Sequence, residues 1–481
     1  MIEPVQPIHI MAKPVCGTCN LQCAYCYYTE KMAELYPGQA RFQMDDATLA
    51  SFVRQYLQLA TWSPVIFGWQ GGEPTLAGID FFRRAVALQR QHAPAGLAVA
   101  NALQTNGTLL DDPWCAFLTE NGFLVGLSLD GPPQWHDHYR RDRAGGETFA
   151  RAWAGLERLR RHRVEFNVLV TLNARNAPHA GDVYRYFVNR GVRWLQFIPI
   201  LERDRRGQVR DFCCTGEQFG RFMIEVFDVW RERHVGVVSE RLIDSVLHTL
   251  VNGRATICCN APRCADAHVL EWNGDLYACD HFVYRHWWIG NIHRTPLDEL
   301  VRSPRLREGD PKRDSSRLGT PFAALKTDLP VPCRQCQYLQ YCQGGCPKHR
   351  LRFPATEDRS QEVNYFCEGY KMFFAHALPE LKRIAESIRQ QEGVPNPDSS
   401  GLGAHVPPSA ERRSPVDAAP AAKAARPASV APRCTSGSRL CRKQPQAGRS
   451  TERSRRSRLC YRNSPCPCGS GRKYKQCCGR K

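Results

Sequence analysis

The chain has 481 residues, of which 42% are hydrophobic and 10% aromatic, so it is long enough for two or three domains with a sizeable core. Its first residues lack the basic stretch and long apolar run of an export signal, and no apolar run is long enough to cross a bilayer. We therefore expect a cytoplasmic protein without a membrane span. Cytoplasmic thiols stay reduced, so the 23 cysteines favour metal ligation over a disulfide framework.

The formal net charge of +19 is not spread evenly along the chain. Residues 395–481 contain 19 Lys and Arg against 4 Asp and Glu, which leaves a net charge of only +4 for the first 394 residues. The basic character therefore belongs to the C-terminal tail and not to the globular part of the protein.

Before the tail, apolar periodicity predicts an alternation of strands and helices. Strands are expected within residues 64–76, 97–107, 123–132, 164–173 and 192–201, and helices within 81–93, 113–122, 148–162 and 179–191. Repeated strand–helix units predict an α/β fold with a parallel sheet, right-handed crossovers and helices packed outside the sheet. Functional groups in such sheets gather at the carboxyl ends of the strands.

Three cysteines lie close together on the first predicted loop. Cys19, Cys23 and Cys26 have the spacing C-x3-C-x2-C, whereas a structural zinc site needs a fourth ligand nearby. Three thiolates on a 4Fe-4S cluster would leave one iron open to a small molecule. A zinc knuckle or a chance grouping of cysteines is the alternative, and Cys16 is a bystander by its spacing.

The segments "CNLQCAYC" and "GGEPTL" resemble the radical S-adenosylmethionine superfamily. The resemblance implies a partial (β/α)6 barrel over residues 8–235, in which the open iron binds S-adenosylmethionine and the cluster donates one electron to release a 5'-deoxyadenosyl radical.

The same resemblance implies a set of cofactor-binding residues. It gives contacts with S-adenosylmethionine to Tyr25, Gly72, Ser128, Arg140 and Leu201. A glycine allows close backbone approach, and a guanidinium can bind both oxygens of a carboxylate. Taken alone, Arg140 could be a surface charge and Leu201 a core residue.

A second and larger set of cysteines follows residue 250. Its eight members are Cys258, Cys264, Cys279, Cys333, Cys336, Cys342, Cys346 and Cys367. Two fully ligated 4Fe-4S clusters would use all eight and act as electron carriers, and zinc sites are the alternative.

The spacing of these eight cysteines resembles the SPASM extension of peptide-modifying radical enzymes, placed here at residues 250–390. By that resemblance, Cys346 completes a first auxiliary cluster with Cys258, Cys264 and Cys279. Cys367 likewise completes a second cluster with Cys333, Cys336 and Cys342.

Within this superfamily, about residues 8 to 390 resemble anaerobic sulfatase-maturating enzymes, through segments such as "FGWQGGEPTL", "LQTNG" and "YACDHFVY". The resemblance implies oxidation of a cysteine or serine, in a Cys/Ser-x-Pro-x-Arg segment of an unfolded sulfatase, to formylglycine. It implies three 4Fe-4S clusters, S-adenosylmethionine and an electron donor such as flavodoxin or ferredoxin. Asp280 would be the proton acceptor, a role that suits it if burial raises its pKa, and Gln70 a substrate contact. Without the family, Asp280 would be interpreted as a solvent-facing carboxylate.

The tail is predicted to contain two parts. Residues 393–460 are rich in Pro, Ala and Ser and predict a disordered basic linker, whose arginines either bind a phosphate backbone loosely or only keep the linker extended. Residues 461–481 contain Cys466, Cys468, Cys477 and Cys478 and resemble the SEC-C zinc module. A segment this short needs a metal to fold, and a docking role toward export or ribosome-associated partners is expected. Free cysteines at the terminus are the alternative.

Two other functions stay open on the sequence. One is a different SPASM peptide modifier that forms a thioether or carbon–carbon crosslink, and the other is a non-enzymatic metal-binding adaptor. The pattern does not separate cysteine-type from serine-type substrates, and it assigns no role to Cys16, Cys213, Cys214 or Cys259.

Overall fold

The computed structural model describes residues 7–39, 41–204, 206–264, 266–307, 322–350 and 362–392. The predicted linker at 393–460 and the C-terminal cysteine motif at 461–481 lie outside these residues.

The described residues are organised around one ten-stranded sheet. Its strands are β1 (His9–Lys13), β2 (Val65–Trp69), β3 (Val99–Thr105), β4 (Leu124–Ser128), β5 (Glu165–Leu172), β6 (Trp194–Pro199), β7 (Ser239–Glu240), β8 (Ala267–Glu271), β9 (Asp275–Tyr277) and β10 (Trp288–Asn291). Their order is β10-β9-β8-β1-β2-β3-β4-β5-β6-β7, and every pair from β8 to β7 is parallel. Only β9 and β10 run antiparallel to their neighbours. The parallel sheet and the five strands predicted from periodicity, which correspond to β2 to β6, are therefore confirmed.

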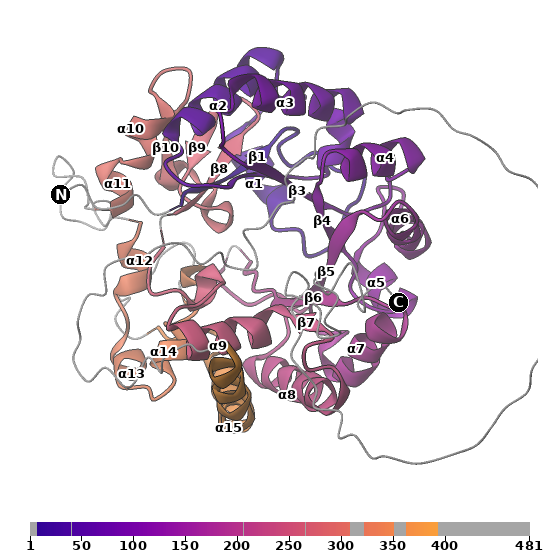
Figure 1. The fold of residues 1–481 in the computed structure, drawn as a ribbon, viewed down its shortest axis with the longest axis vertical. Coiled ribbons are helices and arrows are strands. Elements are labelled where there is room, and N and C mark those ends of the chain that lie inside the picture. The colour runs from indigo at the N-terminus through magenta and orange to yellow at the C-terminus, as the bar shows by residue number, and fades with distance from the viewer. Residues whose placement is uncertain are drawn as a thin grey trace, which may run out of the picture. The chain divides into compact units, whose positions relative to one another are not determined.

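Helices follow the parallel strands and pack outside the sheet. They are α2 (Asp46–Leu59), α3 (Ile79–His92), α4 (Asp112–Glu120), α5 (Pro133–Tyr139), α6 (Phe149–Arg161), α7 (Ala180–Asn189) and α8 (Gly216–Arg233). Figure 1 shows the strands in an arc, with α2 to α4 and α6 to α8 on its outer side. Helix starts carry the expected caps: Asp45 accepts from Thr48 N, and Thr215 and Gln218 form a capping box. Periodicity predicted α3, α4, α6 and α7 but did not identify α2, α5 or α8.

The region that contains the second cysteine set is built from helices that are mostly short. These are α9 (Arg241–Asn252), η3 (Cys258–Asn260), η4 (Asp280–Phe282), η5 (Arg285–Trp287), α10 (Leu297–Val301), α11 (Pro304–Arg307), α12 (Ala324–Thr327), α13 (Val331–Arg334), α14 (Leu339–Cys342) and η6 (Pro347–His349). The remaining elements are α1 (Tyr28–Leu35), η1 (Pro74–Ala77), η2 (Ala177–His179) and the long α15 (Cys367–Glu392). Short helices separated by turns bury little apolar surface of their own, so this region depends on the elements that flank it.

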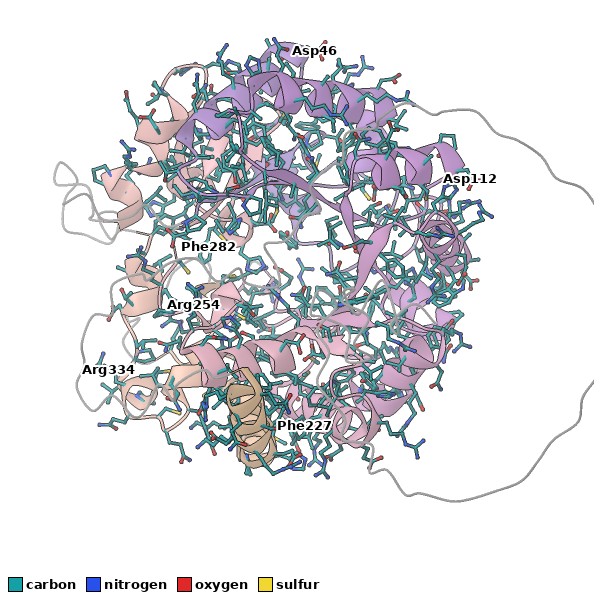
Figure 2. The ribbon with its side chains drawn as sticks, viewed as in Figure 1. Asp46, Asp112, Phe227, Arg254, Phe282 and Arg334 are labelled. Carbon is teal, nitrogen blue, oxygen red and sulfur yellow. The ribbon has the colours of Figure 1, made fainter. Side chains whose placement is uncertain are left out.

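Helix α15 fixes this region against the sheet domain by packing on α8. Phe227 of α8 lies edge-on to Phe373 of α15, with ring centroids 6.2 Å apart, and Figure 2 shows Phe227 beside α15. A Cβ on Gly369 would lie 2.1 Å from the Gly216 carbonyl oxygen, so glycine permits this close helix approach. The first residue of α15 is Cys367, and its position therefore depends on this packing.

Strand β8 extends the sheet on the side of β1 opposite to β2. Lys13 at the end of β1 is directly paired in register with Glu271 at the end of β8. The first cysteine loop follows β1, and the chain reaches Cys279 soon after β8 and β9. Both cysteine regions are thus attached to one continuous sheet. No helix among the described residues is long and apolar enough to cross a membrane.

Glu240 is a buried carboxylate that caps α9, and its titration provides a test of the fold. It accepts hydrogen bonds from Leu242 N and Ile243 N, both at 3.0 Å, and is fully buried. Burial, with the nearby Asp244 charge, raises the pKa of Glu240 to about 8 from an ordinary 4.5. Burial also raises the pKa of Asp244 to about 6.

We predict that the free energy of unfolding falls as the pH rises from 4.5 toward 8, because the folded state retains the Glu240 proton that the unfolded chain has released. Glu240→Gln keeps the cap and cannot ionise, so its stability should fall less over this window, with a difference on the order of 2 kcal/mol. Urea unfolding across the window measures this, with the exposed Glu217→Gln as control. Equal pH dependence of the E240Q and wild-type proteins would contradict the prediction.

Candidate active site

The first cysteine loop is held in place by backbone hydrogen bonds with the end of α5 and with the turn that follows β2. Gln22 N donates to Arg141 O at 2.7 Å, and Ala24 N donates to Tyr139 O at 3.0 Å. On the other side, Gly72 N donates to Cys16 O at 2.7 Å. The loop that carries Cys19, Cys23 and Cys26 therefore lies at the carboxyl ends of the parallel strands, as the sequence predicted.

The glycine-rich turn packs directly against this loop. A Cβ on Gly72 would lie 2.0 Å from the Thr18 carbonyl oxygen, so glycine is required here for contact between two backbones. Approach of a cofactor was the reason expected from the sequence, and the structure adds this packing requirement. The buried Glu73 extends the contact, because its carboxylate accepts from Thr105 Oγ1 at 2.7 Å and Asn106 N at 2.8 Å. The ends of β2 and β3 are thereby tied together beneath the loop.

Two of the three thiols, those of Cys19 and Cys23, are largely desolvated, whereas Cys26 is exposed. Burial raises the pKa of Cys19 to about 11 and that of Cys23 to about 12. Among the described residues, no three His, Cys, Asp or Glu side chains are grouped so that they could hold a single metal ion. A four-iron cluster binds each thiolate at a different corner, so it accepts thiols that lie farther apart than one zinc ion would. A donor set made only of thiols fits such a cluster.

Arg140 is a buried residue whose guanidinium is already partly engaged. Its Nε and Nη2 atoms donate to the two oxygens of Asp130 at 2.9 and 3.1 Å, and Tyr25 Oη donates to the same carboxylate. The guanidinium carbon lies 5.4 Å from the Tyr25 ring centroid. Arg140 is therefore not a surface charge, and a second carboxylate would have to approach its Nη1 edge.

The other predicted contact residues lie on nearby strand ends. Ser128 Oγ accepts from Gln104 Nε2 at 3.0 Å, at the carboxyl ends of β4 and β3. Leu201 follows β6 and is buried, as either a core residue or an adenine contact would be. Gln70 follows β2, and its Oε1 is a buried acceptor without a hydrogen-bond partner among the described residues. Such an unpaired buried oxygen favours a ligand partner.

Asp280 joins the two cysteine regions. Its Oδ1 lies 2.5 Å from Lys13 Nζ, and Tyr27 Oη donates to its Oδ2 at 2.5 Å. Lys13 precedes the first cysteine loop, Tyr27 follows Cys26, and Asp280 follows Cys279. The side chain of Asp280 is only 16% exposed, so it is not the solvent-facing carboxylate of the alternative interpretation.

The pKa of Asp280 is set by its neighbours and not by burial alone. Burial alone would raise the pKa of Asp280, but attraction by Lys13, with hydrogen bonds from Lys13 and Tyr27, outweighs burial and lowers this pKa below its usual range. The condition stated from the sequence, that burial raises this pKa toward the operating pH, is therefore not met. The carboxylate is instead held ionised.

Several lysines around this carboxylate were missed from the sequence. Lys13 is 1% exposed and lies 3.6 Å from the centroid of the Tyr28 ring. Lys31 lies over the rings of Tyr27 and Tyr284, and burial together with Lys348 lowers its pKa to about 7. Lys13 could have been identified from its position, because it ends a mostly apolar strand just before the cysteine motif.

The eight later cysteines form two groups. In the first, burial and the charges of Cys346 and Cys258 raise the pKa of Cys279, and Cys264 is affected by the same two thiols. In the second, burial and the charges of Cys367 and Cys336 raise the pKa of Cys333, and burial and the charges of Cys367 and Cys333 raise the pKa of Cys342. These neighbours belong to the same interleaved sets that the resemblance implied, and the assignment of the eight thiols to two clusters stays a prediction. His281 Nδ1 also lies 3.4 Å from Cys346 Sγ, which places it as a hydrogen-bonding neighbour of that thiol.

The unassigned cysteines occupy structural positions. Cys16 is buried beside Glu271, Cys213 Sγ lies 3.6 Å from Glu202 O, and Cys214 Sγ lies 4.0 Å from Leu172 O. Cys259 Sγ lies 3.0 Å from Asn260 Oδ1. Each therefore contacts protein atoms within the fold. The cysteines at 466, 468, 477 and 478 lie outside the described residues.

Family models match three parts of the chain. Residues 14–186 match the radical SAM superfamily, residues 258–337 match the SPASM iron-sulfur cluster-binding domain, and residues 462–480 match the SEC-C motif. The resemblances found in the two cysteine regions and in the tail are confirmed at the level of these families.

Curated relatives cover most of the chain. A serine-type anaerobic sulfatase-maturating enzyme of Bacteroides thetaiotaomicron is 35% identical over 81% of this chain and 94% of its own length. A cysteine-type anaerobic sulfatase-maturating enzyme of Clostridium perfringens is 34% identical over 80% of this chain and 100% of its own length.

Solved structures agree with this assignment. Native anSMEcpe with bound AdoMet and the Cp18Cys peptide is 34% identical, with a TM-score of 0.70 over 80% of this chain and 100% of that chain. Streptococcus suis SuiB has a TM-score of 0.52 at 13% identity, over 75% of this chain and 77% of its own, and shares the fold alone. By its sequence and its structure, the chain belongs to the family of anaerobic sulfatase-maturating enzymes.

Proposed function

We propose that the chain is a radical S-adenosylmethionine enzyme that oxidises a cysteine or serine of a sulfatase polypeptide to formylglycine. The observation that carries the proposal is the buried Asp280, held between Lys13 and Tyr27, because it places one ionised carboxylate where the two cysteine regions meet. Relatives of the serine and cysteine types are equally similar, so we include both target residues.

The cysteines support a set of three 4Fe-4S clusters. Cys19, Cys23 and Cys26 would hold the cluster that binds S-adenosylmethionine, and the two later groups would hold one cluster each. When bound, these groups supply a 5'-deoxyadenosyl radical and accept the electron that the substrate releases. Support comes from the all-thiol donor sets and from the electrostatic proximity of Cys279 to Cys346 and Cys258, and of Cys333 to Cys367 and Cys336.

Residues on the strand ends would bind and orient the cofactor. Tyr25 and Arg140 share the Asp130 carboxylate, which fixes the guanidinium with its Nη1 edge available to a cofactor carboxylate. Ser128 at the end of β4 and Gly72 after β2 lie at the same edge of the sheet, where they would contact the ribose and the amino group. Leu201 would pack against the adenine. Gln70, with its unpaired buried oxygen, would donate or accept a hydrogen bond at the substrate.

Asp280 would accept the proton of the substrate thiol or hydroxyl. The oxidation removes one hydrogen atom from Cβ, one proton from the heteroatom and one electron. Water then hydrolyses the resulting thioaldehyde with loss of sulfide, or hydrates the aldehyde. Lys13 and Tyr27 keep Asp280 in the proton-accepting form and fix both carboxylate oxygens.

The tail would act in recruitment rather than in chemistry. The match of residues 462–480 to the SEC-C motif supports a zinc module held by the four C-terminal cysteines. A basic linker and a small zinc module would raise the local concentration of a nascent sulfatase or of an export or ribosome-associated partner. A flavodoxin or ferredoxin would supply electrons, and the cytoplasm remains the predicted location.

Iron content tests the cluster assignment. The reconstituted chain should bind about twelve irons, and replacing Cys19, Cys23 and Cys26 together by alanine should remove about a third of them and all cleavage of S-adenosylmethionine. Anaerobic iron and sulfide analysis measures this. Cys16→Ala is the matched control from the same loop and should keep full iron. Unchanged iron in the triple variant would refute the assignment.

The role of Asp280 separates radical formation from substrate oxidation. In the Asp280→Asn variant, the new amide can accept from Lys13 through Oδ1 and donate to Tyr27 Oη through Nδ2, but it is a far weaker base than the carboxylate. We expect 5'-deoxyadenosine to form while formylglycine falls by about 10² to 10⁴. Mass spectrometry with Cys-x-Pro-x-Arg and Ser-x-Pro-x-Arg peptides reads both products, and the exposed Asp298→Asn serves as control. Full formylglycine yield from D280N would exclude Asp280 as the proton acceptor.

Truncation tests the separation of tail and catalytic region. A chain ending at residue 392 should turn over a short Cys-x-Pro-x-Arg peptide at a nearly unchanged rate, because that peptide needs only the sheet-domain site. Turnover of a full-length nascent sulfatase should weaken, and about one zinc per chain should be lost. If short-peptide turnover is lost instead, the tail contributes to the active site and the proposed boundary is functionally wrong.

A further inference from the structure

Lys326 is a buried lysine that lies between the two later groups of cysteines. It belongs to the short helix α12, and its side chain is fully buried. Its ammonium donates to Cys259 O at 2.6 Å and to Gly345 O at 2.5 Å. These carbonyls directly follow Cys258 and directly precede Cys346, two proposed ligands of the first auxiliary cluster. Lys326 therefore joins the two loops that must meet to complete that cluster.

The charge of Lys326 acts on both groups. It lies within electrostatic range of Cys264 and Cys346 in the first group and of Cys342 in the second. Burial lowers the pKa of Lys326, and these thiols oppose that shift. A single ammonium is thus shared by thiols that would hold two different clusters.

Arg350 is a second buried cation in the same place. Its Nη2 atom donates to Leu325 O and, at 3.2 Å, to Lys326 O, so it fixes the backbone of α12. Its charge reaches Cys333 in the second group and Cys264 and Cys346 in the first. Its Nε atom is buried and has no hydrogen-bond partner among the described residues.

Neither cation forms an ion pair with a carboxylate among the described residues, whereas the buried Lys13 pairs with Asp280 and the buried Arg140 pairs with Asp130. An uncompensated buried charge costs several kcal/mol, so buried charges are normally paired or bound to a metal centre. Among the described residues, the negative charge nearest to Lys326 is that of the thiolates of both groups, and Arg350 lies near the same thiolates and near Asp328.

We propose that Lys326, positioned by Arg350, is the shared counter-charge of the two auxiliary iron–sulfur clusters and raises the reduction potential of both. The inference rests on the proposed function, in which the eight cysteines hold two clusters. Reduction adds one negative charge to a cluster, and a nearby buried positive charge stabilises the reduced form in a medium of low dielectric constant. Lys326 is a positioning and tuning residue, since it touches neither substrate nor the proposed ligands.

The test is a redox titration of the full-length, reconstituted chain that lacks the first cluster. Replacing Cys19, Cys23 and Cys26 by alanine leaves only the auxiliary clusters, whose midpoints are followed by electron paramagnetic resonance. In this background, Lys326→Met should shift the reduction equilibrium of both clusters about tenfold toward the oxidised form, which corresponds to about 59 mV for a one-electron couple. Lys326→Arg keeps the charge and should keep the midpoints.

Lys371→Gln is the matched control. Lys371 is exposed on α15, and its charge acts on Cys333 and Cys367 of the second group. Water screens an exposed charge, so its removal should move the midpoints much less than K326M does.

The iron content and the midpoints of the variants decide the proposal. Lower midpoints in K326M with retained midpoints in K326R support it, and so does loss of iron in K326M alone. Full iron with unchanged midpoints in K326M rejects the counter-charge role, and so does the same iron loss in K326M and K326R. Either result leaves the assignment of the two clusters to the eight cysteines standing. Absence of iron from the background protein itself would overturn the cluster assignment together with the inference.

Discussion

The buried ion pair between Lys13 and Asp280 is the contact on which the arrangement of the site depends. A lysine that is 1% exposed at the end of β1 requires an anionic partner, and that partner comes from a residue 267 positions later in the chain. The pair forms only if β8 lies beside β1, because Asp280 follows β8 and β9 directly. One electrostatic requirement thus places the second cysteine region against the first.

The sheet turns this contact into a rigid frame. β1 is paired with β2 on one side and β8 on the other, so the cysteine loop that follows β1 is flanked by elements from both regions. The glycine-rich turn after β2 packs on that loop, and Tyr27 from its far end binds Asp280. The first cysteine loop and the Cys279–Asp280 segment are therefore carried by adjacent parts of one sheet.

Local patterns predicted the parts of the fold that depend on local sequence. The strands β2 to β6 and the helices between them follow from apolar periodicity, which requires no knowledge of distant residues. The pairing of Lys13 with Asp280 and of Arg140 with Asp130 was not predictable in this way, because a partner chosen across the fold leaves no periodic signal. The direction of the pKa shift of Asp280 was not predictable for the same reason: burial could be considered from the sequence, but the lysine that outweighs it could not be identified. The grouping of the eight later cysteines came from family resemblance, since spacing alone allows several pairings.

The distribution of buried charge differs between the two cysteine regions. Near the first loop, Arg140 is neutralised by Asp130, and the buried Glu73 adds a carboxyl group close to Cys19. Near the later groups, Lys326 and Arg350 have no carboxylate partner among the described residues. A positive charge close to a cluster stabilises its reduced form, so under the proposed function the two cations near the later groups favour electron acceptance there.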